Sequence, residues 1–579
     1  MVEIKEEVKN EIFKLAIKNA YQHAGKCLPK PVLGMFLKEN PEYRKAAKEL
    51  LPVVESIVEK VNQMDKEEVE RKAHELGIVK ELEEEKKGKE ESYELPPLPN
   101  AKEGSVVMRI APFPSGPIHI GNARPFIVND EYVKRYKGKL ILVMDDTIGG
   151  GGKEIVPEAY DLIKEGLDYL GIKYNEVVFK SDRLEIYYDY AKELIKKGYA
   201  YVCFCSQEVM GKLRKEGKEC EHRSHSIEEN LEYFEKMLNG EFKQGEAVLR
   251  IKTDMKHKNP AFRDRVIMRI SEKEHPRVGK KYRVWPLLEF SWAVDDHLLG
   301  ITHIIRGKDL MMETMMEKYI WDIFEWESPV IIHTGLLRIE GIKLSKSKAQ
   351  KEVKEGKYFG WDDPRTWSIQ SLKRRGILPE AIRKFALSFG LTKHDITAPI
   401  EALYKENKRI LDPLANRYFF VHDPVKAEIK GLKEAKMKIP LHPEDKKRGF
   451  REFLVKDDSI ILLPKKDVEA LLNNNQKVCR LKDFQNIEIL EFDKKSNEIK
   501  ARVFEGEVDI KKIPKIQWVL DDQKIKCFVV MPDAKILKGV AESNVLNESI
   551  DTVIQFERFG FCRIDEKINK EIKTYYAHG

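Results

Sequence analysis

A strand, a loop rich in glycine and proline, and a helix follow one another from Val106, and this succession constrains the fold most strongly. The apolar run 106–111 precedes the loop "PFPSGPIHIGN", and the segment "ARPFIVNDEYVKRY" after it has helical spacing. A second apolar run, "KLILVMDD", precedes a further helical segment, "EAYDLIKEGLDYLG". This β-α-β rhythm predicts a parallel sheet with a ligand crevice at the carboxyl ends of its strands.

The loop at 112–122 has the residue types of a phosphate-binding turn. Gly116 and Gly121 let the backbone approach a ligand closely, and the start of the next helix offers N–H groups and a positive dipole end. His119 adds a compact donor at the same point. A plain strand–helix turn with a surface histidine would look the same, so the loop alone leaves the function open.

A second candidate motif is the segment "RIEGIKLSKSKAQ" at 338–350. Two ammonium groups, on Lys343 and Lys346, suit the charge that develops on a leaving pyrophosphate. A solvated basic loop is the alternative. The order of the two motifs, one on the first strand–helix turn and one after the last strand, favours a shared nucleotide site.

The two motifs resemble the signatures of a known family. "HIGN" and "KLSKS" stand where class I aminoacyl-tRNA synthetases carry HIGH and KMSKS. "VVMRIAPFPSGPIHIG", "LILVMDDT" and "WPLLEFSWAVDDHLLGITHIIRGKD" resemble the glutamyl/glutaminyl branch, and "FFVHDPV" and "IQFERFGF" resemble its archaeal and eukaryotic form. The resemblance covers almost all of residues 100–579, and the N-terminal helices resemble those of archaeal glutamyl enzymes.

The resemblance implies a multidomain protein with a Rossmann-like α/β class I synthetase core and a parallel sheet. We expect an N-terminal helical domain at 1–97, a catalytic domain at 98–350 with an acceptor-end-binding insertion at about 198–283, a helical stem-contact region at 351–415, and β-barrels that bind the anticodon at 416–579. Short strands such as "SIILLP" and "CFVVMP" with turns between them also favour β-barrels in the last region.

The resemblance also implies roles for both motifs. His119 and Lys346 would stabilise the α-phosphate of ATP while a carboxylate attacks it, and Mg²⁺ would screen the phosphates. Asn122 replaces the second histidine of the family motif, but its amide can still donate to phosphate or ribose. The implied ATP-binding residues are Pro114, Ser115, Gly116, His119, Gly121, Asn122, Lys343, Ser345, Lys346 and Ser347.

Three further residues match the amino-acid site of this branch. Arg109 and Arg306 match the arginines that bind the carboxylates of the substrate, and Asp145 matches the acid that binds its α-ammonium group. Glutamate complements this set, whereas a side-chain amide would leave one arginine without its partner. Ordinary salt bridges are the structural alternative. Glutaminyl relatives lack an arginine at the place of Arg306, so we expect a ligase for L-glutamate and tRNA(Glu), with the glutaminyl enzyme as the nearest alternative.

Some positions depart from the family pattern. Phe113 stands where a small polar residue is common, Leu288 where a tyrosine is common, and "TIGGGGKE" at 147–154 replaces the usual continuation. These departures keep a non-catalytic tRNA-binding protein open. The long β-rich C-terminal part disfavours a smaller nucleotidyltransferase of the pantothenate-synthetase type. The sequence does not decide whether tRNA(Gln) is also charged.

Four potential metal ligands form two tight pairs: Cys203 and Cys205, then Cys220 and His222. Three thiols and an imidazole at this spacing fit a tetrahedral structural Zn²⁺. A reduced, metal-free pair of hairpins is the alternative. Bacterial glutamyl enzymes carry a similar cluster in the insertion that grips the acceptor end.

A basic segment after the second motif is a candidate tRNA face. Basic side chains interleaved with tryptophan suit a phosphate backbone, although a solvated helix fits the run "KRR" equally well. The resemblance implies that this region supports the inner corner of tRNA. The candidate residues are Trp361, Arg365, Lys373, Arg374 and Arg375.

Composition narrows the setting of the protein. Charged residues make up 35% of the chain, and no run of about 20 apolar residues or secretory signal is present. Seven cysteines are too few for a disulfide framework, which favours a reducing, cytoplasmic compartment. The net charge of +7 is compatible with nucleic acid. The N-terminal helices leave a protein partner open.

Overall fold

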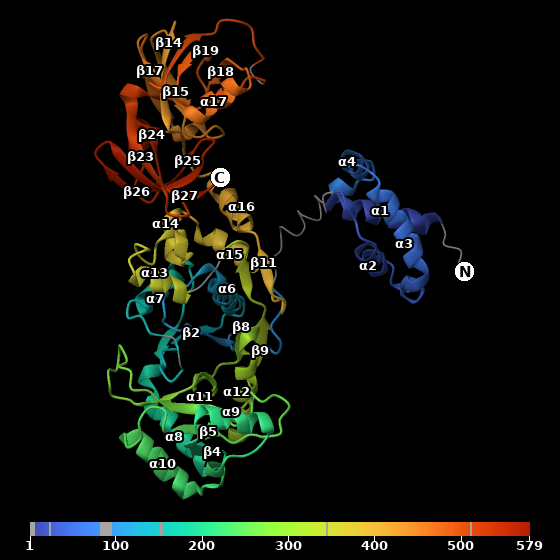
Figure 1. Ribbon diagram of the computed structural model, residues 1–579, viewed down its shortest axis with the longest axis vertical. Coiled ribbons are helices and arrows are strands. Elements are labelled where there is room, and N and C mark those ends of the chain that lie inside the picture. The colour runs from blue at the N-terminus through green and yellow to red at the C-terminus, as the bar shows by residue number, and fades with distance from the viewer. Residues whose placement is uncertain are drawn as a thin grey trace. The chain divides into compact units, whose positions relative to one another are not determined.

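The computed structural model describes residues 6–22, 25–81, 95–150, 152, 154–342, 346–509 and 512–579. The chain divides into two compact units, Met1–Glu94 and Leu95–Gly579 (Figure 1). Each unit has a hydrophobic core of its own.

The N-terminal unit is helical. Ile12, Phe36 and Val54 are fully buried in it, because apolar residues recur at helical spacing along each segment. Asp65 caps one helix by accepting a hydrogen bond from the backbone N–H of Glu68. The helical N-terminus expected from the sequence is confirmed. Its helices include α1 (Glu6–Gln22), α2 (Pro29–Glu39), α3 (Ala47–Asn62) and α4 (Lys66–Glu75).

A parallel sheet with the strand order β3-β2-β1-β8-β9 forms the centre of the Leu95–Gly579 unit. Its strands are β1 (Val107–Ile110), β2 (Lys139–Met144), β3 (Glu176–Phe179), β8 (His303–Gly307) and β9 (Val330–Thr334). Helices α6 (Ile120–Arg135) and α7 (Ala159–Tyr169) follow β1 and β2. The strand order reverses between β1 and β8, so a crevice is expected at their carboxyl ends.

A second, antiparallel sheet is inserted between β3 and β8, with the order β4-β5-β6-β7. Ser226 and Glu229 form a capping box at the start of α10, and Gly240, with φ 84°, ends that helix. The inserted elements are α8 (Leu184–Lys196), β4 (Ala200–Cys203), α9 (Gln207–Glu216), α10 (Ile227–Asn239), β5 (Val248–Ile251), β6 (Val266–Ile270), β7 (Val284–Pro286) and α11 (Leu288–Leu298). Helix α12 (Met311–Phe324) follows β8.

A mainly helical region follows β9. Its short strands β10 (Leu337–Ile339) and β11 (Ile396–Ala398) pair in parallel. Its helices are α13 (Lys346–Lys354), α14 (Ile369–Arg375), α15 (Pro379–Leu387) and α16 (Ile400–Leu411).

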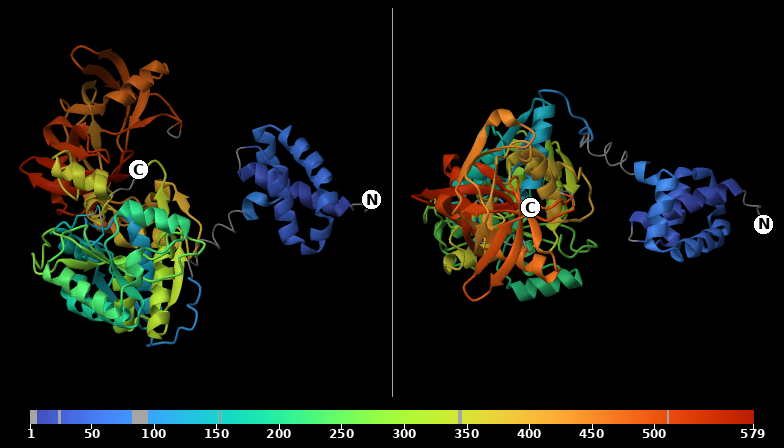
Figure 2. Two further views of the ribbon diagram at one scale, coloured as in Figure 1. Left: turned by 60° about the horizontal axis from the view of Figure 1, so that its bottom comes forward. Right: turned by 90° about the horizontal axis from the view of Figure 1, so that it is seen from above.

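Two curved sheets form the C-terminal region (Figure 2). Val425, Ala427 and Ile429 alternate with exposed residues, which is the period of a strand covered on one face. The predicted all-β region is confirmed, as curved sheets. The first contains β12 (Arg417–Tyr418), β13 (Phe420–His422), β23 (Lys524–Val530), β24 (Ile536–Glu542), β25 (Val553–Phe556), β26 (Gly560–Ile568) and β27 (Glu571–His578). The second contains β14 (Pro424–Lys430), β17 (Ile460–Pro464), β18 (Val478–Leu481), β19 (Asn486–Asp493), β20 (Glu498–Val503), β21 (Lys515–Ile516) and β22 (Val519–Leu520). The hairpin β15 (Ala435–Pro440) and β16 (Phe450–Val455), and helix α17 (Lys465–Asn473), complete the region.

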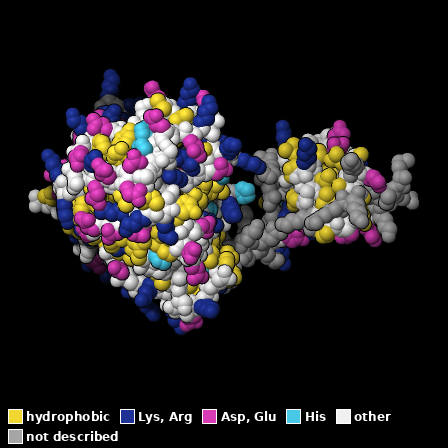
Figure 3. Space-filling model, turned by 90° about the horizontal axis from the view of Figure 1, so that it is seen from below, with side chains coloured by type: hydrophobic (Ala, Val, Ile, Leu, Met, Phe, Trp, Pro, Cys, Tyr) yellow, Lys and Arg dark blue, Asp and Glu magenta, His cyan; other side chains and the backbone are white. Residues whose placement is uncertain are grey.

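The surface carries both signs of charge. Acidic and basic side chains are interspersed over the face that Figure 3 presents. Within the described ranges, no helix is both long and apolar enough to cross a membrane.

Candidate functional site

The loop between β1 and α6 is held by the segment that precedes α14. The backbone N–H of Ile369 donates to the carbonyl of Ile118 at 2.8 Å, and that of Ile120 donates to the carbonyl of Trp367 at 3.2 Å. Between these bonds, His119 forms a β-bridge with Ser368 and is the N-cap residue of α6. Residues far apart in the sequence therefore fix the backbone of the first motif.

Gly116 occupies a position that requires glycine. Its φ of +148° is one that L-residues rarely adopt, and a Cβ there would lie 2.8 Å from the ring of Trp361. The indole of Trp361, a predicted tRNA contact, thus packs directly against the predicted phosphate-binding loop.

A cavity of about 1230 Å³ opens where β1, β2 and β8 end. Phe113 and Leu288 also line it, so neither position offers the cavity a hydroxyl group. Pro114 and Gly116 belong to the same loop but not to the cavity lining. The predicted residues that line the cavity are Arg109, Ser115, His119, Gly121, Asn122, Asp145 and Arg306.

The second motif is described only in part. Lys343 and Ser345 lie outside the described residues, and Lys346 and Ser347 begin α13 with side chains that also lie outside them. Ile342, directly before Lys343, lines the cavity. The segment "KLSKS" therefore follows a residue of the cavity wall, and the pairing of its lysines with His119 stays a prediction.

The two predicted carboxylate-binding arginines are buried and already paired. Arg109 donates to both oxygens of Asp296, at 2.5 and 2.8 Å, and Arg306 donates to both oxygens of Glu317, at 2.9 and 2.6 Å. Such pairs compensate a buried charge. Burial raises the pKa of Glu317 above its ordinary value, and Arg306 opposes this shift. The Nε atom of Arg306 is buried and has no hydrogen-bond partner in the described part of the chain. The salt bridges that were the structural alternative to carboxylate binding are thus present. They leave the Nε–H of Arg306 without a partner among the described residues.

Asp145, the predicted partner of an α-ammonium group, is the first residue after β2. Its carboxylate lies 2.8 Å from the ammonium of Lys180, which is fully buried. The same ammonium donates to Ser291 Oγ at 2.8 Å. Sequence reasoning missed Lys180, because one lysine after a strand among 104 basic residues carries no signal of its own.

Trp292, on α11, lies against all three of these cations. Its ring centroid is 4.5 Å from Arg109 Cζ, 5.0 Å from Lys180 Nζ and 5.1 Å from Arg306 Cζ. It is 5% exposed and lines the cavity. Helical spacing places it on the same face as Asp296, the partner of Arg109. Sequence reasoning missed Trp292 as well, because a tryptophan in an apolar helix is typical of a core.

The glycine run after β2 has a structural reason at two of its positions. A Cβ on Gly149 would lie 2.8 Å from the backbone oxygen of Trp285. Gly152 has φ +95°, which L-residues rarely adopt. Gly150 lines the cavity, and no atom lies within 4 Å of a Cβ built there.

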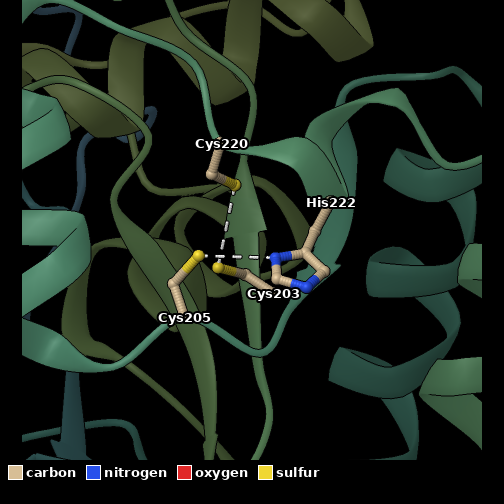
Figure 4. A group of neighbouring side chains, drawn as sticks. All are labelled: Cys203, Cys205, Cys220 and His222. Atoms are coloured by element: carbon tan, nitrogen blue, oxygen red, sulfur yellow. Dashed lines mark hydrogen bonds between the residues drawn. The ribbon is translucent and has the colours of Figure 1, made fainter.

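The four predicted metal ligands point toward one another (Figure 4). Cys203 Sγ lies 4.0 Å from Cys220 Sγ, and Cys205 Sγ lies 3.4 Å from His222 Nδ1. All four ligand atoms lie within 4.8 Å of one another. A tetrahedral ion with metal–sulfur bonds of about 2.3 Å needs ligand atoms about 3.8 Å apart, so the donor set fits Zn²⁺. The hydrogen bond between Cys203 and Cys220 lowers the pKa of Cys203 to about 7 and raises that of Cys220 to about 12, so it favours a thiolate on one member of this pair.

The predicted tRNA-binding residues differ in their burial and in their hydrogen bonds within the protein. Arg365 donates to both oxygens of Asp363. Arg374 donates to both oxygens of Asp565. Arg375 is 1% exposed and donates to backbone carbonyls of β27. Lys373 pairs with Glu165 at the surface, where 47% of its side chain is exposed. Of these basic residues, Lys373 is the most accessible to a phosphate.

Comparison with known proteins identifies the family. Residues 105–413 match the model described as "tRNA synthetases class I (E and Q), catalytic domain", and residues 415–508 and 515–565 match two models of the corresponding anti-codon binding domain. A glutamate–tRNA ligase of Pyrococcus furiosus is 48% identical over 99% of this chain and 100% of its own length. One of Methanocaldococcus jannaschii is 45% identical at the same coverage. A crystal structure of a glutamate tRNA ligase from Elizabethkingia meningosepticum aligns with 54% of this chain and 70% of its own, with 19% identity and a TM-score of 0.37. On the matched domains and the full-length relatives, the chain belongs to the class I tRNA synthetases of the glutamate and glutamine branch.

Proposed function

We propose that this protein is a glutamate–tRNA ligase, which activates L-glutamate with ATP and transfers it to the 3′ end of tRNA(Glu). Full-length relatives that carry this name support the proposal. The observation that carries the choice of amino acid is the buried guanidinium of Arg306, which pairs with Glu317 and whose Nε–H has no partner among the described residues. A substrate carboxylate satisfies that donor with a charge-assisted bond, whereas an amide oxygen would do so more weakly.

The reaction requires no protein nucleophile. An oxygen of the glutamate α-carboxylate attacks the α-phosphorus of ATP, the bond to the bridging oxygen breaks, and pyrophosphate leaves. A terminal ribose hydroxyl of tRNA then attacks the carbonyl carbon of the adenylate, and AMP leaves. The protein contributes position and charge stabilisation: His119 at the start of α6 and the lysines of the second motif would stabilise the phosphate charge, and Mg²⁺ would accompany ATP.

The test is ATP–pyrophosphate exchange in the presence of tRNA, measured separately with glutamate and with glutamine. We expect faster exchange with glutamate. Faster exchange with glutamine would assign the chain to the glutaminyl alternative, and tight tRNA binding without exchange would favour a non-catalytic protein. A charging assay with tRNA(Glu) and tRNA(Gln) then measures how strictly the tRNA is selected.

A structural Zn²⁺ held by Cys203, Cys205, Cys220 and His222 is part of the proposal. The ion would join the end of β4 to the turn after α9, within the insertion. The convergence of three sulfur atoms and one imidazole nitrogen supports it.

Transfer RNA is the proposed macromolecular partner. The matched anti-codon binding domains support it, and Lys373 is the candidate contact that the structure leaves most accessible. All seven cysteines are free of disulfides, which supports a reducing, cytoplasmic compartment. A protein partner of the N-terminal helices stays a prediction.

A further inference from the structure

We propose that Trp292 is a substrate-binding residue, and that its indole N–H donates to the substrate carboxylate that Arg306 binds. This inference rests on the proposed function, because it assumes a dicarboxylic amino acid in the cavity. It assigns a role to a residue that neither signature motif contains.

The first argument is the hydrogen bonding of the indole. Nε1 of Trp292 is buried and has no acceptor in the described part of the chain. Three other buried tryptophans each donate to a backbone carbonyl: Trp285 to Tyr282 at 3.3 Å, Trp321 to Ala293 at 2.9 Å and Trp518 to Lys482 at 2.9 Å. A buried donor is rarely left unpaired. Among these four, Trp292 is the one that lines the cavity, so an acceptor supplied by a ligand explains the difference.

The second argument is a neighbouring donor of the same kind. Nε of Arg306 is also buried without a partner, and the guanidinium of Arg306 lies 5.1 Å from the indole ring. Both residues line the same cavity. A carboxylate has two oxygen atoms and accepts from two converging donors, so one group on the substrate could satisfy both.

The third argument is the charge balance around the ring. The three cations at Trp292 are already paired with Asp296, Asp145 and Glu317. A substrate carboxylate that binds beside them therefore needs a further hydrogen-bond donor, and the indole N–H is a donor that carries no charge. The ring face meanwhile orients the guanidinium groups through cation–π contacts.

The experiment separates the N–H from the ring. Trp292→Phe keeps an aromatic face against the cations and removes the donor. We expect the KM for glutamate to rise about tenfold, which is the usual effect of losing a hydrogen bond to a charged group, while kcat and the KM for ATP stay near wild type. Trp321→Phe is the matched control, since its Nε1 is satisfied inside the fold, and it should leave the KM for glutamate unchanged.

A second measurement does not depend on a variant that folds well. In wild-type protein labelled with ¹⁵N in the indole groups, glutamate should shift one Trp N–H resonance, and that resonance should be absent from the spectrum of Trp292→Phe. An unchanged KM in Trp292→Phe, or no shift of that resonance at saturating glutamate, would overturn the inference. Absence of glutamate-dependent exchange in the wild-type enzyme would instead contradict the proposed function.

Discussion

Replacing Gly116 with alanine tests whether the first motif is built as the structure indicates. Two costs add at this position. A non-glycine residue at φ +148° is strained by about 1–3 kcal/mol. The new methyl group would also lie 2.8, 3.1 and 3.3 Å from three ring atoms of Trp361, an overpacking that costs a further 1–3 kcal/mol or so. We therefore expect the catalytic region to lose about 2–6 kcal/mol of stability.

The effect on activity should exceed the effect on stability. A displacement of about 1 Å in a positioning loop reduces rates roughly 100-fold, so ATP–pyrophosphate exchange should fall by about that factor. Gly104→Ala is the matched control, because Gly104 has φ +78° but no atom within 4 Å of a Cβ; it should show strain without loss of exchange. The double variant Gly116→Ala/Trp361→Ala should lose less stability than the two single changes add up to. Wild-type exchange in Gly116→Ala, or strict additivity in the double variant, would refute the reasoning.

Three further predictions address other parts of the molecule. Arg306→Lys removes the bidentate bond to Glu317 and the Nε–H, so the KM for glutamate should rise roughly 10–100-fold. Arg183→Lys alters another arginine–carboxylate pair outside the cavity lining and should leave this KM unchanged; an equal rise in both variants would show that Arg306 does not bind the substrate. Cys220→Ser should lose its stoichiometric zinc, measured by elemental analysis, and the insertion should unfold at a lower temperature. Cys479→Ser, at a buried cysteine of the second C-terminal sheet, should keep the metal; zinc retained in Cys220→Ser would contradict the proposed site. Burial lowers the pKa of His578 to about 4 from its ordinary value of 6.5, so between these pH values the unfolded chain binds a proton that the folded chain does not, and stability should fall as the pH drops from 6.5 to 4. His578→Gln should reduce the slope of unfolding temperature against pH in this range; an unaltered slope would exclude His578 as its source.

The sequence predicts the elements whose signal is local. The apolar run of β1 and the glycines and prolines of the loop after it predict the strand–loop–helix order. The run "SIILLP" predicts a short strand, which the structure has as β17. The spacing of Cys203 to His222 predicts a cluster that the structure does bring together. In each case the pattern lies within a few residues or a pair of short motifs.

Contacts between distant residues are what the sequence does not reveal. The sequence does not identify Lys180 and Trp292 as site residues, because they come together with Arg109 and Arg306 only when β3 and α11 pack in the fold. Arg375 reads as a solvated cation in the run "KRR", yet it is buried and bonded to the last strand. Arg109 and Arg306 likewise look available in the sequence, whereas the fold has already paired each of them with a carboxylate.

Helix α14 links the loop of His119 to the first C-terminal sheet. Ile369 at its first position is bonded to the loop of His119, and Arg374 and Arg375 near its last position are bonded to Asp565 and to the carbonyls of β27. The side of the protein proposed to read the anticodon and the loop proposed to hold ATP are therefore attached to opposite ends of a single seven-residue helix. A displacement of the first C-terminal sheet would therefore have to be absorbed within this helix or passed on to the backbone around His119.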